Sequence, residues 1–208
     1  MQGSTGSATY SGGIFTVTGA GNISGTADAF HLAYLPLNGD GSITARVASF
    51  SGGAPYPEVG VMIRETLTAS STYAMVYFNP NQAYLRYRPT TGASDTAQAT
   101  GFGNPATPYW VRLIRNGNSF SGCISPDGTN WTQVGTTQTI TMATNVYKGL
   151  AVSGNGGYLE TATFDNVLAT IGSTPFISGI EPLIGGVGTQ VTIAGSNFAA
   201  RRGAVRSH

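Results

Sequence analysis

The feature that most constrains this chain is an alternation of apolar and polar residues with a period of two, which recurs from residue 14 to residue 168. Such alternation is typical of β-strands, because successive side chains point to opposite faces of a sheet. Turn-forming residues separate the alternating segments, as in NGDG at 38–41 and GNGG at 154–157. The pattern predicts strands at Ile14–Thr18, Phe30–Leu35, Ser42–Phe50, Glu58–Thr66, Tyr73–Phe78, Ala83–Arg88, Tyr109–Arg115, Ser119–Ser125, Thr132–Val134, Tyr147–Ser153 and Leu159–Leu168.

Many short strands joined by tight turns predict an all-β fold in which two antiparallel sheets pack face to face. We expect almost no helix, because only 9 % of the residues are charged and Lys148 is the only lysine, whereas glycine occurs 30 times. A length of 208 residues suffices for one large sandwich with a buried core. It is slightly too short for two ordinary domains.

Two turns are specified by their residues. Asn116-Gly117 joins two expected strands, and this dipeptide favours a type I′ turn because it tolerates positive φ angles. Ser125-Pro126-Asp127-Gly128 predicts a second turn, in which proline presets φ and glycine takes the left-handed position. SPDGTNW at 125–131 also resembles a shortened Asp-box, whose Ser, Asp and Trp stabilise a hairpin, so we expect a structural role for it.

The composition changes near residue 173, which divides the chain into a sandwich at 1–172 and a remainder at 173–208. The stretch PFISGIEPLIGGVGTQVTIAGSNF at 175–198 predicts a linker and two short strands of a different domain, too short to close a core of its own. The basic end AARRGAVRSH has no strand pattern. We expect it to be disordered, or to be an artefact of cloning or of a frameshift.

The charge balance argues against nucleic acid as a partner. The net charge is +1 at pH 7, and three of the ten basic residues lie in the last eight positions. Residues 1–174 contain seven basic and eight acidic side chains, which is too even a balance for a long-range attractive field. The chain has no apolar run of about 18 residues, so we also expect no membrane insertion.

Cysteine use limits the cofactors. Cys123 is the only cysteine, which excludes an internal disulfide and a cysteine-based zinc site, and we expect no cofactor. A chain rich in Gly, Ser and Thr and poor in Lys fits a secreted or cell-surface bacterial protein, which we expect to be a monomer. The start MQGSTGSATY carries no secretion signal and is typical of a trimmed or recombinant start.

Six ordered stretches resemble one family: TADAFHLAY (26–34), GDGSITARV (39–47), VGVMIRETL (59–67), YWVRLIRNGNSFSGCISPDGTNW (109–131), GLAVSG (149–154) and TATFDNV (161–167). Together they resemble the bacterial DUF1349 family of concanavalin A-like jelly rolls, over about residues 8–170. The resemblance implies a two-sheet antiparallel jelly-roll sandwich and linkage to extracellular carbohydrate-active or surface proteins. It brings no established catalytic residues. Separately, GTQVTIAGSNF resembles the core pattern of an immunoglobulin-like IPT/TIG domain, of which we expect only an incomplete segment.

Histidine is too scarce for most hydrolytic mechanisms. The chain has only His31 and His208, so a Ser-His-Asp triad or a histidine metal site would depend on His31. A half-buried histidine beside Phe30 on a strand is the more common role. His31 therefore remains a weak catalytic candidate.

The carboxylates suit a glycosidase little better. A retaining enzyme needs two carboxyl groups about 5 Å apart. Glu58 and Glu65 are the nearest candidates, but seven positions separate them, so in a regular strand they point to opposite faces. A β-bulge, or a partner such as Glu160 or Asp165 from another strand, would restore a pair. Both residues are weak catalytic candidates.

A set of arginines and tyrosines shares a parity that would place them along one groove, if their strands are neighbours. Tyrosine rings stack on sugar rings, while guanidinium groups donate to hydroxyls or uronate carboxylates. The alternative is that the arginines pair with Asp28, Glu58 and Glu65 and hold the sheet together. The predicted ligand-binding residues are Arg46, Arg64, Tyr73, Tyr77, Tyr84, Arg86 and Arg88.

Two loop carboxylates are weak candidates for a metal. Asp28, and Asp40 within GDG at 39–41, would join backbone oxygens around a structural Ca²⁺. No dense D-x-D-x-D loop supports such a site.

These observations favour an extracellular module that binds a polysaccharide or other glycan, or mediates adhesion, without catalysis. The first alternative is a glycoside hydrolase or polysaccharide lyase acting on a plant or microbial polysaccharide. The second alternative is a structural spacer domain.

Overall fold

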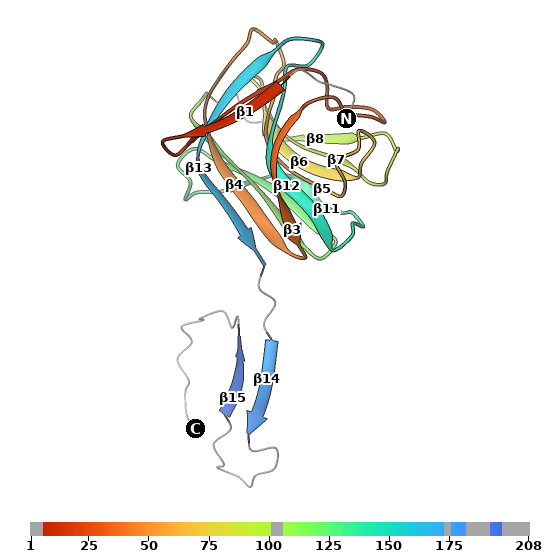
Figure 1. Cartoon of the computed structure of the whole chain (residues 1–208), viewed down its shortest axis with the longest axis vertical. Coiled ribbons are helices and arrows are strands. Elements are labelled where there is room, and N and C mark those ends of the chain that lie inside the picture. The colour runs from red at the N-terminus through yellow and green to blue at the C-terminus, as the bar shows by residue number, and fades with distance from the viewer. Residues whose placement is uncertain (1–5, 101–105, 173–175, 182–191, 197–208) are drawn as a thin grey trace. The chain divides into compact units, whose positions relative to one another are not determined.

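The computed structural model describes residues 6–100, 106–172, 176–181 and 192–196. The chain divides into two compact units, Met1–Gly172 and Ser173–His208. All elements in the described residues are β-strands (Figure 1). No helix among them is long and apolar enough to cross a membrane.

The first unit contains a seven-stranded sheet in the order β1-β2-β13-β4-β9-β10-β11, in which every neighbouring pair is antiparallel. β13 and β4, which come from opposite ends of the unit, lie side by side at its centre (Figure 1). The strands are β1 (Gly6–Ser11), β2 (Ile14–Gly19), β4 (Gly41–Ser51), β9 (Tyr109–Asn116), β10 (Ser119–Ser125), β11 (Thr132–Thr139) and β13 (Glu160–Ile171).

A six-stranded antiparallel sheet forms the second layer, in the order β3-β12-β5-β6-β7-β8. Its strands are β3 (His31–Asn38), β5 (Glu58–Arg64), β6 (Tyr73–Phe78), β7 (Ala83–Arg88), β8 (Thr96–Thr100) and β12 (Asn145–Ser153). The predicted all-β sandwich of two antiparallel sheets is confirmed. All eleven expected strands are present, and β1 and β8 are additional.

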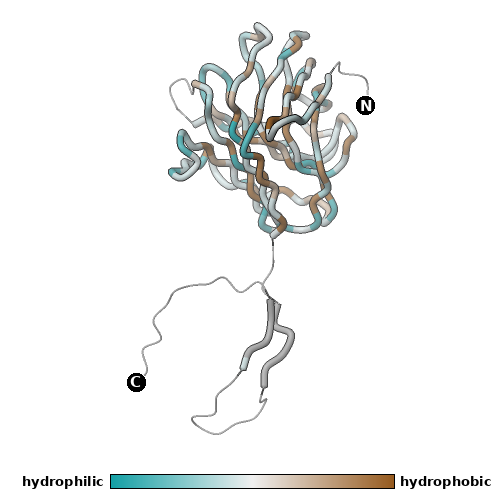
Figure 2. The backbone as a smooth tube through the Cα atoms, turned by 60° about the vertical axis from the view of Figure 1, so that its left-hand side comes forward, coloured by the Kyte–Doolittle hydropathy of each residue, from teal (hydrophilic) through white to brown (hydrophobic). Residues whose placement is uncertain are grey.

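The core lies between the two sheets, where alternate residues of each strand meet. On the six-stranded sheet, Val61, Val76 and Leu85 face this core, and on the seven-stranded sheet Ala45 and Leu113 do so. Apolar stretches follow the strands of the first unit in Figure 2, while hydrophilic stretches occupy many of its loops. Each strand of the six-stranded sheet therefore turns its other residues outward.

A second apolar cluster covers part of the outer face of the six-stranded sheet. Met62, Met75 and Tyr77 of that face pack with Ile23, which lies in the segment between β2 and β3. We call residues 20–30 the covering segment. It is fastened at its far end, where Asp28 N donates to Ala69 O. The outer face around β5, β6 and β7 is therefore largely enclosed.

The turn between β9 and β10 differs from the prediction. Asn116 pairs with Ser119, so the two loop residues are Gly117 and Asn118 rather than Asn116 and Gly117. Only Gly117 has a positive φ angle, 58°, and a positive φ at the first central residue alone defines a type II′ turn. The predicted type I′ turn is wrong because strand pairing moves the turn by one residue.

The second expected turn is present. Ser125 Oγ accepts hydrogen bonds from Asp127 N and Gly128 N, and Gly128 has a φ angle of 77°. Asp127 Oδ1 accepts from the backbone N–H groups of Thr129 and Asn130, and Trp131 Nε1 donates to Gly128 O. The Asp-box-like residues thus hydrogen-bond within their own loop, as a structural role requires.

The second unit contains an antiparallel pair, β14 (Phe176–Glu181) and β15 (Thr192–Ser196). These strands lie within the stretch for which two short strands were expected. The basic end at 199–208 lies outside the described residues.

Candidate functional site

The arginines of the six-stranded sheet are held by carboxylates, two of which, Asp28 and Glu58, the structural alternative named; the third, Glu65, pairs with no arginine among the described residues. Arg88 forms a two-pronged ion pair with Asp28, with Nη1 2.8 Å from Oδ2 and Nη2 2.6 Å from Oδ1, and both side chains are fully buried. Arg64 Nη2 lies 3.6 Å from Asp28 Oδ2. Burial raises the pKa of the Asp28 carboxyl and outweighs the two guanidinium groups that lower it. The covering segment thus brings the anion that neutralises these two arginines.

Arg86 is engaged by two further carboxylates. Its Nη1 donates to Glu58 Oε1 and to the carbonyl oxygen of Ile23, and its Nε forms an ion pair with Asp95 Oδ2 at 3.2 Å. The other oxygen of Glu58 accepts from Ile23 N at 2.9 Å. Burial raises the pKa of Glu58, while Arg86 acts in the opposite direction. Glu58 is 2 % exposed and is fixed from both sides.

A pocket of about 170 Å³ remains open at one end of this face. We call it the Tyr56 pocket. The Glu58–Arg86 pair forms part of its lining, and the other side chains come from three sources: a loop before β5, the β6–β7 hairpin, and the loop after β12. The lining residues are Tyr56, Glu58, Tyr77, Asn79, Tyr84, Arg86 and Asn155.

The aromatic side chains of the Tyr56 pocket are held at different depths. The rings of Tyr77 and Tyr84 are stacked with centroids 5.1 Å apart, and Arg86 lies 5.2 Å from the centroid of Tyr77. Gln82 Nε2 donates to the Tyr84 hydroxyl at 2.6 Å. Tyr56 is 52 % exposed. The pocket thus combines a stack of one buried and one half-buried ring, Tyr77 and Tyr84, with one exposed ring.

The remaining predicted ligand residues lie elsewhere. Arg46 is on β4 of the other sheet, where its Nε donates to Asp165 Oδ1 at 2.7 Å. Tyr73 is fully buried beside Arg88, whose guanidinium carbon lies 4.9 Å from its ring centroid. The condition that the arginine strands be neighbours therefore holds for β5, β6 and β7, but not for β4.

The three catalytic candidates do not share the Tyr56 pocket. Glu65 follows the opposite end of β5 from Glu58, and its Oε1 accepts from Ala143 N at 2.8 Å. His31 begins the edge strand β3, where burial lowers its pKa. Only Glu58 of the three lines the pocket, and Glu58 and Glu65 are separated by the length of β5.

The two metal candidates, Asp28 and Asp40, contact different residues. Asp28 is paired with Arg88, while Asp40 Oδ1 accepts from Gly117 N at 2.6 Å. Within the described residues, no three His, Cys, Asp or Glu side chains gather as a metal site would need. Both oxygens of Asp28 are engaged by Arg88, whereas a structural Ca²⁺ held by Asp40 and backbone oxygens stays a prediction.

Tyr56, Asn79 and Asn155 were not predicted as site residues. All three lie in connections between strands, where no periodic pattern marks a side chain that faces a pocket. A tyrosine between Pro55 and Pro57 was the available signal, because a ring between two prolines in a loop has few ways to become buried.

A comparison with known protein families finds no match, and no curated protein matches the chain. The family resemblances drawn from the sequence therefore remain predictions. Solved structures do match. A functionally unknown protein from Saccharomyces cerevisiae has a TM-score of 0.65 at 16 % identity, over 82 % of this chain and 97 % of that one.

Two structures with carbohydrate-related names also match. A Family 7 alginate lyase in complex with product has a TM-score of 0.53 at 7 % identity, over 78 % of this chain and 81 % of that one. A GH43 protein from Bacillus licheniformis has a TM-score of 0.50 at 12 % identity, over 76 % of this chain but 33 % of that one. At such identities the similarity concerns the fold alone, and it confirms the predicted jelly-roll, concanavalin A-like sandwich.

Proposed function

We propose that the first unit binds a carbohydrate in the Tyr56 pocket and does not cleave it. The observation that carries the proposal is the combination of an exposed ring, Tyr56, with a pocket in which the one carboxylate among the described lining residues, Glu58, is already bound by Arg86 and by Ile23 N. The jelly-roll fold that the chain shares with a Family 7 alginate lyase and a GH43 protein supports a carbohydrate as the ligand class.

The lining of the Tyr56 pocket suits a sugar. Tyrosine rings contact the C–H faces of sugars, and the amides of Asn79 and Asn155 are groups that exchange hydrogen bonds with hydroxyls. A volume of about 170 Å³ is below that of a typical small-molecule site. The pocket therefore fits a single sugar residue at a chain end or branch better than a whole oligosaccharide.

The chemistry of the same residues argues against cleavage. Hydrolysis of a glycosidic bond requires two carboxyl groups flanking that bond, and Glu58 lines the pocket alone. A lyase requires a base, but His31 is not a lining residue, and burial raises the pKa of Tyr77, so its phenol stays protonated at neutral pH. Binding at a secreted or surface location, by a monomer, belongs to the same proposal.

The test is a glycan array with the release of reducing ends measured in parallel. We expect retained glycans without products. Tyr56→Ala should weaken the retained interaction about tenfold, the effect of losing one stacked ring. Tyr34→Ala is the matched control, because Tyr34 is 46 % exposed but lies on β3, where its ring contacts Tyr147. Product formation that Glu58→Gln abolishes would replace binding by catalysis.

A further inference from the structure

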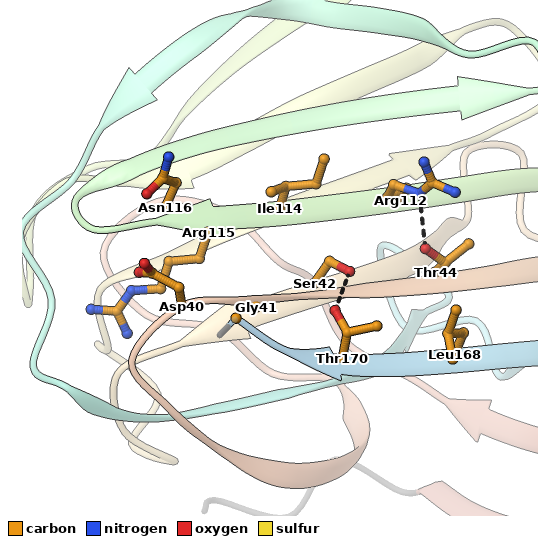
Figure 3. A pocket seen from close by; sticks show the side chains of 11 residues that line it. Asp40, Gly41, Ser42, Thr44, Arg112, Ile114, Arg115, Asn116, Leu168 and Thr170 are labelled. Atoms are coloured by element: carbon orange, nitrogen blue, oxygen red, sulfur yellow. Dashed lines mark hydrogen bonds between the residues drawn. The ribbon is translucent and has the colours of Figure 1, made fainter. Parts of the chain in front are cut away.

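A larger groove runs across the outer face of the seven-stranded sheet (Figure 3). We call it the outer groove. It has a volume of about 520 Å³ and is open along β13, β4 and β9. Ser42 and Thr170, whose hydroxyls hydrogen-bond at 2.8 Å, line it together with the apolar side chain of Ile114, and Leu168 lies at one side with 58 % exposure. In the described residues no chain segment like the covering segment encloses this face.

Arg112 is the principal charged group of the outer groove. Its Nε donates to Thr44 Oγ1 at 3.0 Å (Figure 3). Its guanidinium carbon lies 3.7 Å from the ring centroid of Trp131. These two contacts fix the plane of the guanidinium, and within the described part of the chain the edge formed by its two Nη atoms has no hydrogen-bond partner. Among the described residues, no carboxylate pairs with Arg112, whereas Arg46, on the same sheet, pairs with Asp165.

Arg115 is the second cation in the lining of the outer groove. Lys148, on β12 of the six-stranded sheet, is not a lining residue; it is buried, and its Nζ donates to the backbone carbonyl oxygens of Ser42 and Thr170. Arg115 is also buried and donates to the carbonyl oxygens of Gly117, Met142 and Ala143, and its Nη1 is buried without a partner. The lining includes a single carboxylate, Asp40. The outer groove therefore has an excess of positive charge.

We propose that the outer groove binds an acidic polysaccharide through its uronate carboxylates, with Arg112 as the anchor. A carboxylate accepts two parallel hydrogen bonds from the Nη edge of a guanidinium, and that edge is the part of Arg112 that remains free. Serine and threonine hydroxyls along β4 and β13 are available to sugar hydroxyls, and Leu168 offers an apolar contact to a ring face. The proposal does not depend on the Tyr56 pocket, which is on the other sheet.

The experiment compares two probes, an oligogalacturonate and its methyl ester, which have the same sugar chain with and without charge. We expect the wild-type protein to bind the acid form and to bind it more weakly as salt is added. Arg112→Gln should weaken this binding about 10- to 100-fold, the effect of losing a charged hydrogen-bonding pair. Arg46→Gln is the matched control, because Arg46 lies on the same face but already has a carboxylate, and it should change binding less than about twofold.

A second pair of variants tests the charge without touching an arginine. Leu168→Glu adds a negative charge to the outer groove at an exposed position, and Leu168→Gln adds a side chain of the same shape without charge. Binding of the acid form should fall with Glu and persist with Gln. Equal binding of the two probes, or full binding by Arg112→Gln, would overturn the proposal. Tyr56→Ala should leave uronate binding intact. If this variant no longer bound the acid form, the Tyr56 pocket and not the outer groove would be the binding site.

Discussion

The outer faces of the two sheets carry similar residues in different states. On the six-stranded sheet, Arg64 and Arg88 are buried and paired with Asp28. On the seven-stranded sheet, Arg112 is partly exposed and stacks on Trp131 with no carboxylate partner among the described residues. On both faces, arginines lie at every second position of a strand together with threonine, tyrosine or other residues. The periodicity of the strands therefore does not tell the two faces apart.

The covering segment makes the difference. Its Ile23 packs against Met62 and Met75 of the six-stranded sheet, and its Asp28 forms ion pairs with two arginines of that sheet. An arginine on a sheet face is thus a structural group or a binding group according to whether another part of the chain brings it an anion. Whether such an arginine stabilises the fold or binds a ligand therefore depends on the carboxylate near it and not on the arginine alone.

The largest expected effect comes from removing that anion. Asp28→Asn keeps the shape of the side chain but leaves Arg64 and Arg88 buried without a negative charge. Breaking a buried pair in this way lowers the free energy of unfolding by about 3–5 kcal/mol. Urea denaturation of the wild type and the variant at neutral pH measures the difference.

Arg112→Gln is the comparison on the other face, and we expect it to lower the free energy of unfolding by about 1 kcal/mol, because it removes a hydrogen bond to Thr44 and the contact with Trp131 but leaves no buried charge without its partner. A loss below about 1 kcal/mol for Asp28→Asn would contradict the view that the covering segment is fastened by charge.

The second largest effect is expected from the apolar contacts of the covering segment. Ile23→Ala removes a fully buried side chain from the cluster of Met62, Met75 and Tyr77. We expect a loss of about 2–3 kcal/mol, the lower part of the usual range, because the half-buried Phe30 and Tyr84 beside it allow some collapse. Thermal or urea unfolding measures it.

Leu168→Ala removes a side chain of similar size from the uncovered face, where 58 % exposure leaves little to lose. It should change stability by less than about 0.5 kcal/mol. Equal losses for the two variants would mean that the two faces are equally enclosed.

Most of the fold could be predicted because strand alternation is a local property. The strands that were missed lack this signal. β1 (GSATYS) is exposed along its whole length, so neither of its faces needs apolar residues. β8 (TAQAT) carries small or polar side chains at an edge of the six-stranded sheet. The turn at Gly117 was misassigned because its position depends on which residues pair across the hairpin.

The candidate site could be predicted only in part. Parity correctly placed Tyr77, Tyr84 and Arg86 on one face, because β6 and β7 are neighbours. The partners of the arginines could not be predicted, since Asp28 reaches Arg88 across 60 positions of sequence. Tyr56 and Asn155 lie in loops, whose side-chain directions follow from tertiary packing rather than from spacing.

The smallest expected effect on stability concerns the ion pair that distinguishes Arg46 from Arg112 on the outer face of the seven-stranded sheet. Asp165 distinguishes Arg46 from Arg112, and the hydrogen bond from Arg46 lowers the pKa of the Asp165 carboxyl against the opposing effect of burial. A carboxyl with a lower pKa in the folded chain stabilises the fold above its unfolded pKa of about 4, and this stability is lost as the pH falls through the folded value. Asp165→Asn should therefore lower the free energy of unfolding by about 0.5 kcal/mol at neutral pH, because the pair is partly solvated.

When urea denaturation is repeated from pH 7 down to about pH 3, the difference between wild type and Asp165→Asn should be constant to about pH 5 and should shrink as the pH falls further, because the wild-type carboxyl takes up a proton only as the pH falls through its lowered pKa. A difference that stayed constant over this range would come from packing and not from the ion pair. Arg46 would then be as free as Arg112 to meet an external anion, and the positive surface would extend beyond the outer groove toward the other end of β4.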